Sequence, residues 1–207
     1  MGEVCQLSSG FVGLRHLHYR FECEAAVTEG DKVEAQIKFG WEVDAYPVNE
    51  IAQSVDAVSE ADVNTLVEEY YDRYEILLEG RDEKEFRKHV AVQAQIEIGF
   101  ERFLEEKNYQ AIVTHFGDLG ALKQLPGLAI QRLMEKGYGF GAEGDWKVAA
   151  MVRLMKIMTG DLKNPKGTSM LEDYTYNLVK GKEFWRRICW KSVQVLQRDR
   201  SALSAIH

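Results

Sequence analysis

Apolar and polar residues alternate with a period of two in parts of this chain, which predicts strands there. Lys32–Phe39 alternates throughout, so we expect a half-exposed strand at these residues. Ala111–Phe116 is a short apolar run typical of a buried strand. We expect a further strand at Tyr138–Glu143 and a β-like segment at Thr168–Leu178.

Other segments have apolar residues at the spacing of a helix. Ser59 and Asp62 resemble a capping box, so we expect a helix to follow them. Three further helices are expected over Lys84–Lys107, Pro126–Lys136 and Asp145–Met158. The second of the four carries an apolar stripe of Phe86, Val90, Ile96, Phe100, Phe103 and Leu104. The last carries a stripe that we expect in the core, formed by Met151, Leu154, Met155 and Met158.

The order of these elements indicates the fold class. Strands that alternate with helices along a chain are typical of a parallel sheet covered by helices. We therefore expect an α/β fold, a layered αβα domain with a mostly parallel sheet and irregular ends.

Composition narrows the class of protein. The 207 residues are 45% hydrophobic and 29% charged, the balance of a soluble globular protein. The net charge of −7 argues against nucleic acid as a partner, because phosphate contacts need clustered Lys and Arg. No apolar run is long enough for a membrane span, and the N-terminus lacks the pattern of a secretory signal. The three cysteines are too widely spaced for a disulfide framework, so we expect a cytoplasmic protein.

One acidic residue lies where a predicted strand meets a predicted helix. Glu143 belongs to the stretch GYGFGAEGDWK (Gly137–Lys147), and ligands of open α/β sheets bind at such strand ends. An acid there is also explained by the favourable field of a helix N-terminus. Asp145 is expected to be the N-cap or a first-turn acid of that helix rather than a ligand. The glycines form neither a P-loop nor a GxGxxG pattern, so they give only weak support to nucleotide binding.

A second acidic pair and two histidines are further candidates. Glu172 and Asp173 are adjacent on a predicted strand and face opposite sides, so at most one points into a given site. A solvated acidic pair is the alternative. His115, at the end of a predicted strand, is either a ligand or acid–base group or a histidine hydrogen-bonded in place. His89 is expected at the surface.

Three long segments are distinctive enough to compare with known families. They are AVTEGDKVEAQIKFGW (Ala26–Trp41), LKQLPGLAIQRLMEKGYGFGAEGDWKVAA (Leu122–Ala150) and MLEDYTYNL (Met170–Leu178). All three resemble segments of one family, L-arabinose isomerase. Residues 26–183 as a whole resemble the central part of that enzyme, and they make up about three quarters of this chain.

The resemblance implies a metal-dependent aldose–ketose isomerase of arabinose catabolism. Such an enzyme converts L-arabinose to L-ribulose through an enediol, with Mn²⁺ or another divalent cation as cofactor, and forms a homo-oligomer. The family's metal-binding and proton-transfer carboxylates fall on Glu143 and Glu172, and an aromatic residue near the sugar falls on Phe116. Around Phe116 the chain reads THFGDLGALKQ where the family usually reads TTFEDLHGLKQ. The LKQLPG stretch that follows contains Gln124, to which we assign no role.

Beyond the second glutamate, the family supplies two metal-binding histidines that this chain does not match. The first lies in a string such as LGAHMLEVCPSIA. The codons of Arg187–Gln197, read one nucleotide earlier, can spell AHMLEVCPSIA, so we expect a shifted reading frame near Glu183. The first histidine then falls across the codons of Arg187 and Ile188, and His207 is not a substitute.

The chain is therefore divided by sequence into four parts. They are an unmatched segment 1–25, the central α/β domain 26–165, the start of the family's C-terminal domain 166–183, and a frameshifted tail 184–207. The first hypothesis for function is an L-arabinose isomerase fragment that is inactive alone because both histidines are missing. A non-catalytic assembly module that binds a full-length isomerase is the second, and a nucleotide-binding α/β domain is the third.

Overall fold

The structure is a computed structural model of the whole chain. It describes residues 11–14, 31–78, 80–114, 119–142, 144–159 and 202–203, and the first and last of these ranges only as backbone. The predicted strand Thr168–Leu178 and the tail 184–207, apart from 202–203, lie outside the described residues.

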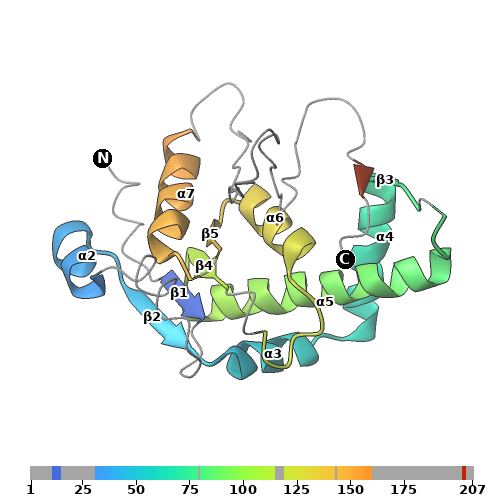
Figure 1. Cartoon of the computed structure of the whole chain (residues 1–207), viewed down its shortest axis with the longest axis horizontal. Helices are drawn as coiled ribbons and strands as arrows, with labels where there is room; N and C mark the ends of the chain where they lie inside the picture. Colours follow the sequence, from blue (N-terminus) through green and yellow to red (C-terminus); the bar gives the residue numbers. More distant parts are fainter. Residues whose placement is uncertain are drawn as a thin grey trace, which may run out of the picture.

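A four-stranded parallel sheet forms the centre of the molecule (Figure 1). Its order is β2 (Val43–Tyr46), β1 (Phe11–Leu14), β4 (Ala111–Val113) and β5 (Gly139–Gly141). Each neighbouring pair is parallel, with Ala111 level with Gly139. The parallel sheet predicted from the alternation of strands and helices is thus confirmed. A second pairing joins β3 (Glu75–Ile76) to β6 (Ala202–Leu203), also in parallel.

Helices cover both faces of the sheet. On one face lie α3 (Val48–Asp56), α5 (Glu83–Lys107) and α6 (Gly127–Glu135), which share the largest apolar cluster with Ile112 and Phe140. The other face receives α7 (Trp146–Met158) and α2 (Lys32–Phe39), whose buried residues meet Ala111 and Val113. Because alternate residues of a strand point to opposite faces, three residues of β4 serve both layers. The arrangement is the expected αβα layering.

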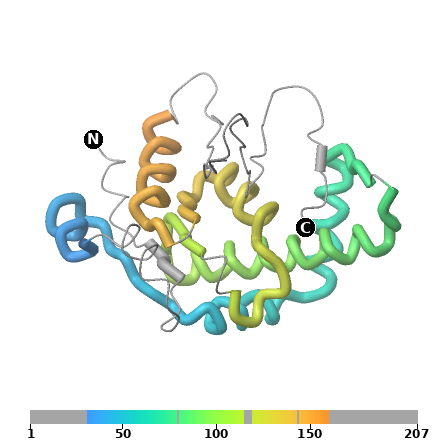
Figure 2. Tube along the Cα trace, viewed as in Figure 1, coloured from blue at the N-terminus to red at the C-terminus, as the bar shows by residue number. Residues whose placement is uncertain are grey.

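A helical hairpin extends from the sheet on the side opposite α2 (Figure 2). It consists of α4 (Glu60–Arg73) and the first half of α5, and it has its own apolar cluster around Tyr70, Phe86 and Val90. Ser59 accepts a hydrogen bond from Asp62 N–H at 3.2 Å, which confirms the predicted cap of α4. All six residues of the predicted apolar stripe of α5 are buried, as expected.

The prediction of a strand at Lys32–Phe39 is wrong, because these residues form α2. The Asp31 carboxylate accepts a hydrogen bond from Glu34 N–H at 2.9 Å and caps the first turn. Gly40 ends the helix with a left-handed φ of 68°. Only Ala35 of this helix is buried, so local capping rather than burial of one face decides its structure.

The methionine stripe of α7 was expected in the core, and this prediction is also wrong. Leu154 is half-buried, and three residues are exposed, namely Met151, Met155 and Met158. The side of α7 that faces the sheet carries Trp146, Ala149 and Ala150 instead. Ala149 and Ala150 are small, and this part of the helix lies very close to the backbone of β5.

Candidate active site at the sheet edge

Strands β4 and β5 end next to each other at one edge of the sheet. Val113, the last residue of β4, is in register with Gly141, the last residue of β5. The loops that leave the two strands are also joined, because Gly144 N–H donates a hydrogen bond to the carbonyl of Thr114 at 3.2 Å. In parallel sheets this carboxyl-terminal edge is where ligands bind.

The glycines of the GYGFGAEG stretch permit close packing of α7 on β5. A Cβ atom on Gly139 would lie 2.2 Å from the carbonyl oxygen of Ala149, and one on Gly141 would lie 1.9 Å from that of Asp145. Both separations are far below van der Waals contact, so only glycine fits at either position. These two glycines serve helix packing, which removes support for a phosphate-binding loop.

Asp145 caps α7, as the sequence predicted. One oxygen of its carboxylate accepts hydrogen bonds from Lys147 N–H and Val148 N–H, each at 3.0 Å. A carboxylate engaged with the first turn of its helix satisfies backbone donors that have no partner within the helix. Asp145 therefore fixes the start of α7 directly after the position of Glu143 in the chain.

The residues predicted to carry chemistry lie outside the described part of the chain. Glu143 is one residue from Gly144, and His115 and Phe116 directly follow Thr114 in the sequence. Glu172 also lies outside the described residues. Among the residues that are described, no three or more His, Cys, Asp or Glu side chains come together as a possible metal site. The fit of a divalent cation to the predicted glutamates therefore rests on the chemistry of their oxygen atoms.

The segment after β4 is held by two side chains from other helices. Asn49, in the first turn of α3, accepts a hydrogen bond from Ala121 N–H at 3.1 Å. Gln93 of α5 donates to the Gln124 side chain and to the Leu125 carbonyl, both at 2.8 Å. The part of this loop that is described is thereby fixed to the helical layer.

Gln93 also caps α6 from another helix. Its Oε1 atom accepts hydrogen bonds from Leu128 N–H at 3.2 Å and Ala129 N–H at 3.4 Å. Pro126, at the N-cap position, makes no such side-chain bond. His89 is exposed, as predicted, and its Nδ1 lies 3.0 Å from Gln124 Nε2. The sequence gives no signal for this role of Gln93, because the partners are 35 and 36 residues away.

A buried ionic network joins α4, α5 and α6 on the side of the hairpin. Arg132 Nε lies 3.0 and 2.8 Å from the two carboxylate oxygens of Glu97. Tyr70 donates to the same carboxylate at 2.5 Å, and Arg132 also donates to Glu69 at 2.6 Å. The Arg132 guanidinium lies over the Tyr70 ring, 4.8 Å from its centroid. Burial without such partners would cost several kcal/mol for each charge, so these contacts make the buried charges tolerable.

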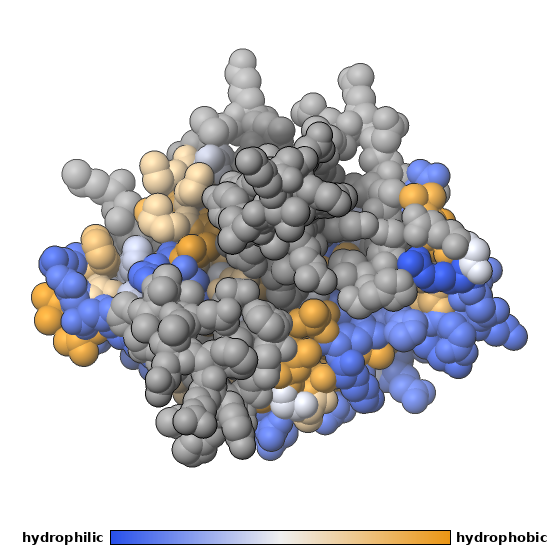
Figure 3. Space-filling view, viewed as in Figure 1, coloured by the Kyte–Doolittle hydropathy of each residue, from blue (hydrophilic) through white to orange (hydrophobic). Residues whose placement is uncertain are grey.

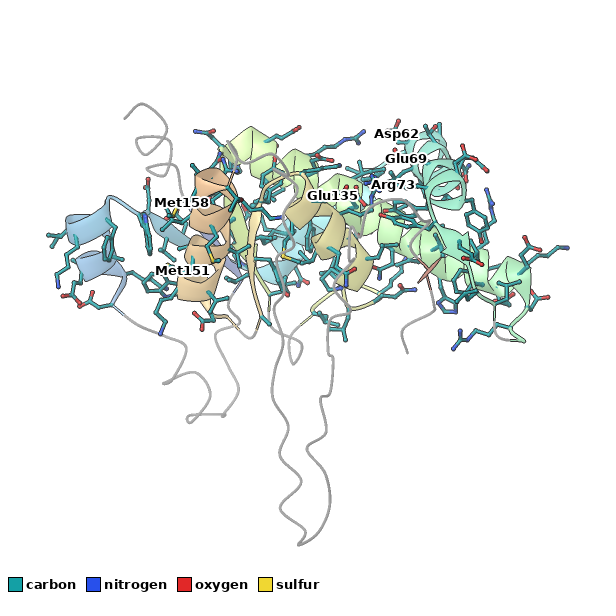
Figure 4. The ribbon with its side chains drawn as sticks, turned by 90° about the horizontal axis from the view of Figure 1, so that it is seen from above. Asp62, Glu69, Arg73, Glu135, Met151 and Met158 are labelled. Carbon is teal, nitrogen blue, oxygen red and sulfur yellow. The ribbon has the colours of Figure 1, made fainter. Side chains whose placement is uncertain are left out.

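The network extends toward solvent at both ends. Lys136 lies 3.1 Å from Glu97 and 2.5 Å from Glu101. Arg73 and Glu135 form another ion pair, and Figure 4 shows these side chains directed toward one another from α4 and α6. A glutamate at position 97, next to the buried Ile96 and within the apolar stripe, is the one signal from which this network could have been found.

Charge and burial together shift the pKa values of Tyr70 and Lys136 in the network. Burial, followed by the negative charge of Glu97, raises the pKa of Tyr70 well above its usual value. For Lys136, burial disfavours the charged form, but hydrogen bonding to Glu101 and the charge of Glu97 outweigh it, and the net pKa is raised. Both groups therefore keep their protons at neutral pH, and both donate to carboxylates.

Comparison with known proteins gives one consistent result. Residues 22–161 match the family described as the L-arabinose isomerase central domain. The L-arabinose isomerase of Geobacillus stearothermophilus is 54% identical over 160 residues, which cover 77% of this chain and 32% of that protein. The enzyme of Halalkalibacterium halodurans is 50% identical over 187 residues, which cover 88% of this chain and 37% of that protein. The enzyme of Salmonella enteritidis PT4 is 50% identical over 160 residues, which cover 77% of this chain and 32% of that protein. The chain thus spans about a third of the length of these curated relatives.

The parallel sheet and the helices on both of its faces define a layered α/β domain. The chain belongs to the family of L-arabinose isomerase central domains. Within the described ranges, no helix has both the length and the apolar character that a bilayer crossing requires.

Proposed function

We propose that this chain supplies the sheet-bearing domain of an L-arabinose isomerase, which interconverts L-arabinose and L-ribulose. One observation carries the proposal. The segment that matches the family, residues 22–161, contains the edge at which β4 and β5 end side by side. Glu143 and Phe116 follow these two strands in the sequence, and carboxyl ends of parallel strands are the usual position of ligands.

Each predicted residue has a role in this proposal. Glu143 and Glu172 carry hard oxygen donors, which suit Mn²⁺ or another divalent cation. When bound, the cation would polarise the sugar oxygens on C1 and C2. The two carboxylates take a proton from C2 of the aldose and return one to C1, while the proton of the C2 hydroxyl passes to O1, which gives the ketose. Phe116 lies against the sugar, and the working enzyme is a cytoplasmic homo-oligomer.

Metal binding by the isolated chain tests the role of the glutamates. Two carboxylates without the histidines of the family should hold Mn²⁺ weakly, and titration followed by electron paramagnetic resonance measures this. Glu143→Gln and Glu172→Gln should each reduce binding, whereas Glu106→Gln, on the exposed end of α5, should leave it unchanged. Mn²⁺ binding that is indifferent to both glutamate substitutions would contradict the proposal.

A direct assay tests the activity of residues 1–207 on their own. With L-arabinose and added Mn²⁺ we expect no ketose above the background of a protein-free control, because the two histidine ligands are missing from the matched region. Clear turnover by the isolated chain would show that its own residues complete the site.

A second candidate function is a non-catalytic assembly module that binds a full-length isomerase. The exposed apolar side chains of α2 and α7 favour it, because large apolar groups in a row on one helix mark contact surfaces. Co-purification of the chain with a full-length family member would support this function, and a lone monomer in the same experiment would argue against it.

A further inference from the structure

Exposed apolar side chains are concentrated on the two helices nearest the limits of the matched segment. Eight large apolar side chains of the described residues are exposed, and six of these lie on α2 or α7. The first of these helices is near the start of the segment 22–161, and the second ends three residues before its last position. Figure 3 shows the apolar surface over α2 at the left margin and over α7 above it.

The inner side of α7 packs against the sheet, and its outer side carries the exposed methionines. Trp146, Ala149 and Ala150 are buried against β4, and Arg153 donates to the Gly137 carbonyl at 2.8 Å and to Gln110 at 2.9 Å. These contacts fix the position of the helix from its first turn to its third. The exposed methionines therefore add nothing to the attachment of α7 to its own sheet.

The exposed residues of α7 form one stripe that points away from the sheet. Met151, Met155 and Met158 are spaced by four and three residues, which places them on one side of a helix. Their exposed fractions rise along the helix, from 48% through 59% to 70%. Figure 4 shows Met151 and Met158 along the length of α7. The stripe is thus most exposed at the C-terminal end of α7.

We infer that this methionine stripe is the docking surface for the domain that follows the central domain in a full-length chain of this family. The inference rests on the proposed function for the identity of its partner. The 160 residues that align with the Geobacillus stearothermophilus enzyme cover 32% of it, so a large part of such a full-length chain lies outside the aligned region. The family match ends at residue 161, three residues after Met158. Methionine is flexible and polarisable, and it is enriched at protein contact surfaces.

Methionine oxidation provides a readout that does not depend on catalysis. In the isolated chain, peroxide should oxidise the three stripe residues rapidly, whereas Met134, which is buried at 7% exposure in α6, should react slowly. In a chimera of the Geobacillus stearothermophilus enzyme carrying residues 22–161 of this chain, the three should react about tenfold more slowly than in the isolated chain. Equal oxidation rates in both proteins would overturn the inference. If the methionines of the isolated chain become more protected as its concentration rises, the stripe binds a second copy of the chain, which would also overturn the inference.

A crosslink identifies which domain covers the stripe. A photoreactive benzoyl-phenylalanine in place of Met155 in the chimera should join to peptides that follow the central domain, and joining to peptides before it would overturn the inference. If the chimera does not fold, transfer of α7 alone into the relative keeps both measurements possible. Protected methionines in an inactive chimera would leave the docking surface intact and count against the proposed function. An active chimera whose three methionines are oxidised as fast as in the isolated chain would support the proposed function and overturn the docking surface.

Discussion

Arg132 of α6 and Glu97 of α5 form a buried ion pair, with the guanidinium Nε 2.8 Å from the nearer carboxylate oxygen. Glu97 is completely buried and Arg132 is 3% exposed. The pair links the hairpin of α4 and α5 to α6, which follows the loop after β4. The candidate sheet edge and the distant hairpin are therefore parts of one packed unit.

Removal of one charge from this pair should destabilise the protein strongly. Glu97→Gln leaves the Arg132 guanidinium buried with less compensation, and we expect a loss of about 3–5 kcal/mol in the free energy of unfolding. Urea denaturation measures it. Lys88→Ala is the control, since the Lys88–Glu85 pair is exposed on both sides and such pairs contribute about 1 kcal/mol or less. A Glu97→Gln protein as stable as the control would contradict the energetic role of the network.

Stability should fall at alkaline pH because of Tyr70. Burial and the charge of Glu97 raise the pKa of Tyr70 in the folded protein, whereas the unfolded chain releases this proton near a pKa of about 10. Its contribution is complete below about pH 10 and declines above it by about 1.4 kcal/mol per pH unit. Denaturation curves for the wild type and Tyr70→Phe, recorded from neutral to alkaline pH, should show a shallower decline in the variant. Identical declines would exclude Tyr70 as a source of the pH dependence.

Gly141 should not tolerate alanine. The added Cβ would meet the Asp145 carbonyl oxygen at 1.9 Å, so α7 must move away from β5, and we expect a loss of about 3 kcal/mol or more. Gly80→Ala is the comparison. Gly80 has a φ of 84° and open space around it, so an alanine there should cost only backbone strain, about 1–2 kcal/mol. Thermal or urea unfolding of the two variants separates a steric clash from strain, and equal losses would argue against close packing of α7.

Gln93 should control local opening at the start of α6. Gln93→Ala removes the acceptor of Leu128 and Ala129 N–H, and we expect a loss of about 1–2 kcal/mol with faster hydrogen exchange at these two amides. Gln95→Ala is a matched control two residues away, since Gln95 bonds only the Val55 carbonyl among the contacts described for it. Unchanged exchange at Leu128 in the Gln93 variant would show that Pro126 alone suffices to start the helix.

Local signals in the sequence predicted much of the fold. The apolar run Ala111–Phe116, of which Ala111–Val113 form β4, depends on neighbours within a few residues, as do the stripe of α5 and the caps Ser59 and Asp145. The αβα class followed from the order of such elements. The division of the chain into domains and the residues Glu143, Glu172 and Phe116 stay predictions.

Features that depend on distant contacts could not be predicted in this way. The alternation at Lys32–Phe39 favours a strand only if one face is buried, and here the neighbouring structure covers Ala35 alone. The methionines of α7 are apolar at helical spacing, but the glycine backbone of β5 selects the opposite side of the helix for burial. The pair of Glu97 and Arg132 joins residues 35 apart in sequence, so the glutamate within the apolar stripe of α5 indicates a buried charge but does not identify its partner.

Ketose formation by the chimera tests the central claim most directly. The enzyme of Geobacillus stearothermophilus carrying residues 22–161 of this chain should convert L-arabinose to L-ribulose with added Mn²⁺. Glu143→Gln in the chimera should lower the initial rate by about 10²-fold or more, because a group that transfers protons is lost, while Glu106→Gln should leave the rate unchanged. A folded chimera that makes no ketose, or one in which Glu143→Gln retains the full rate, would contradict the account.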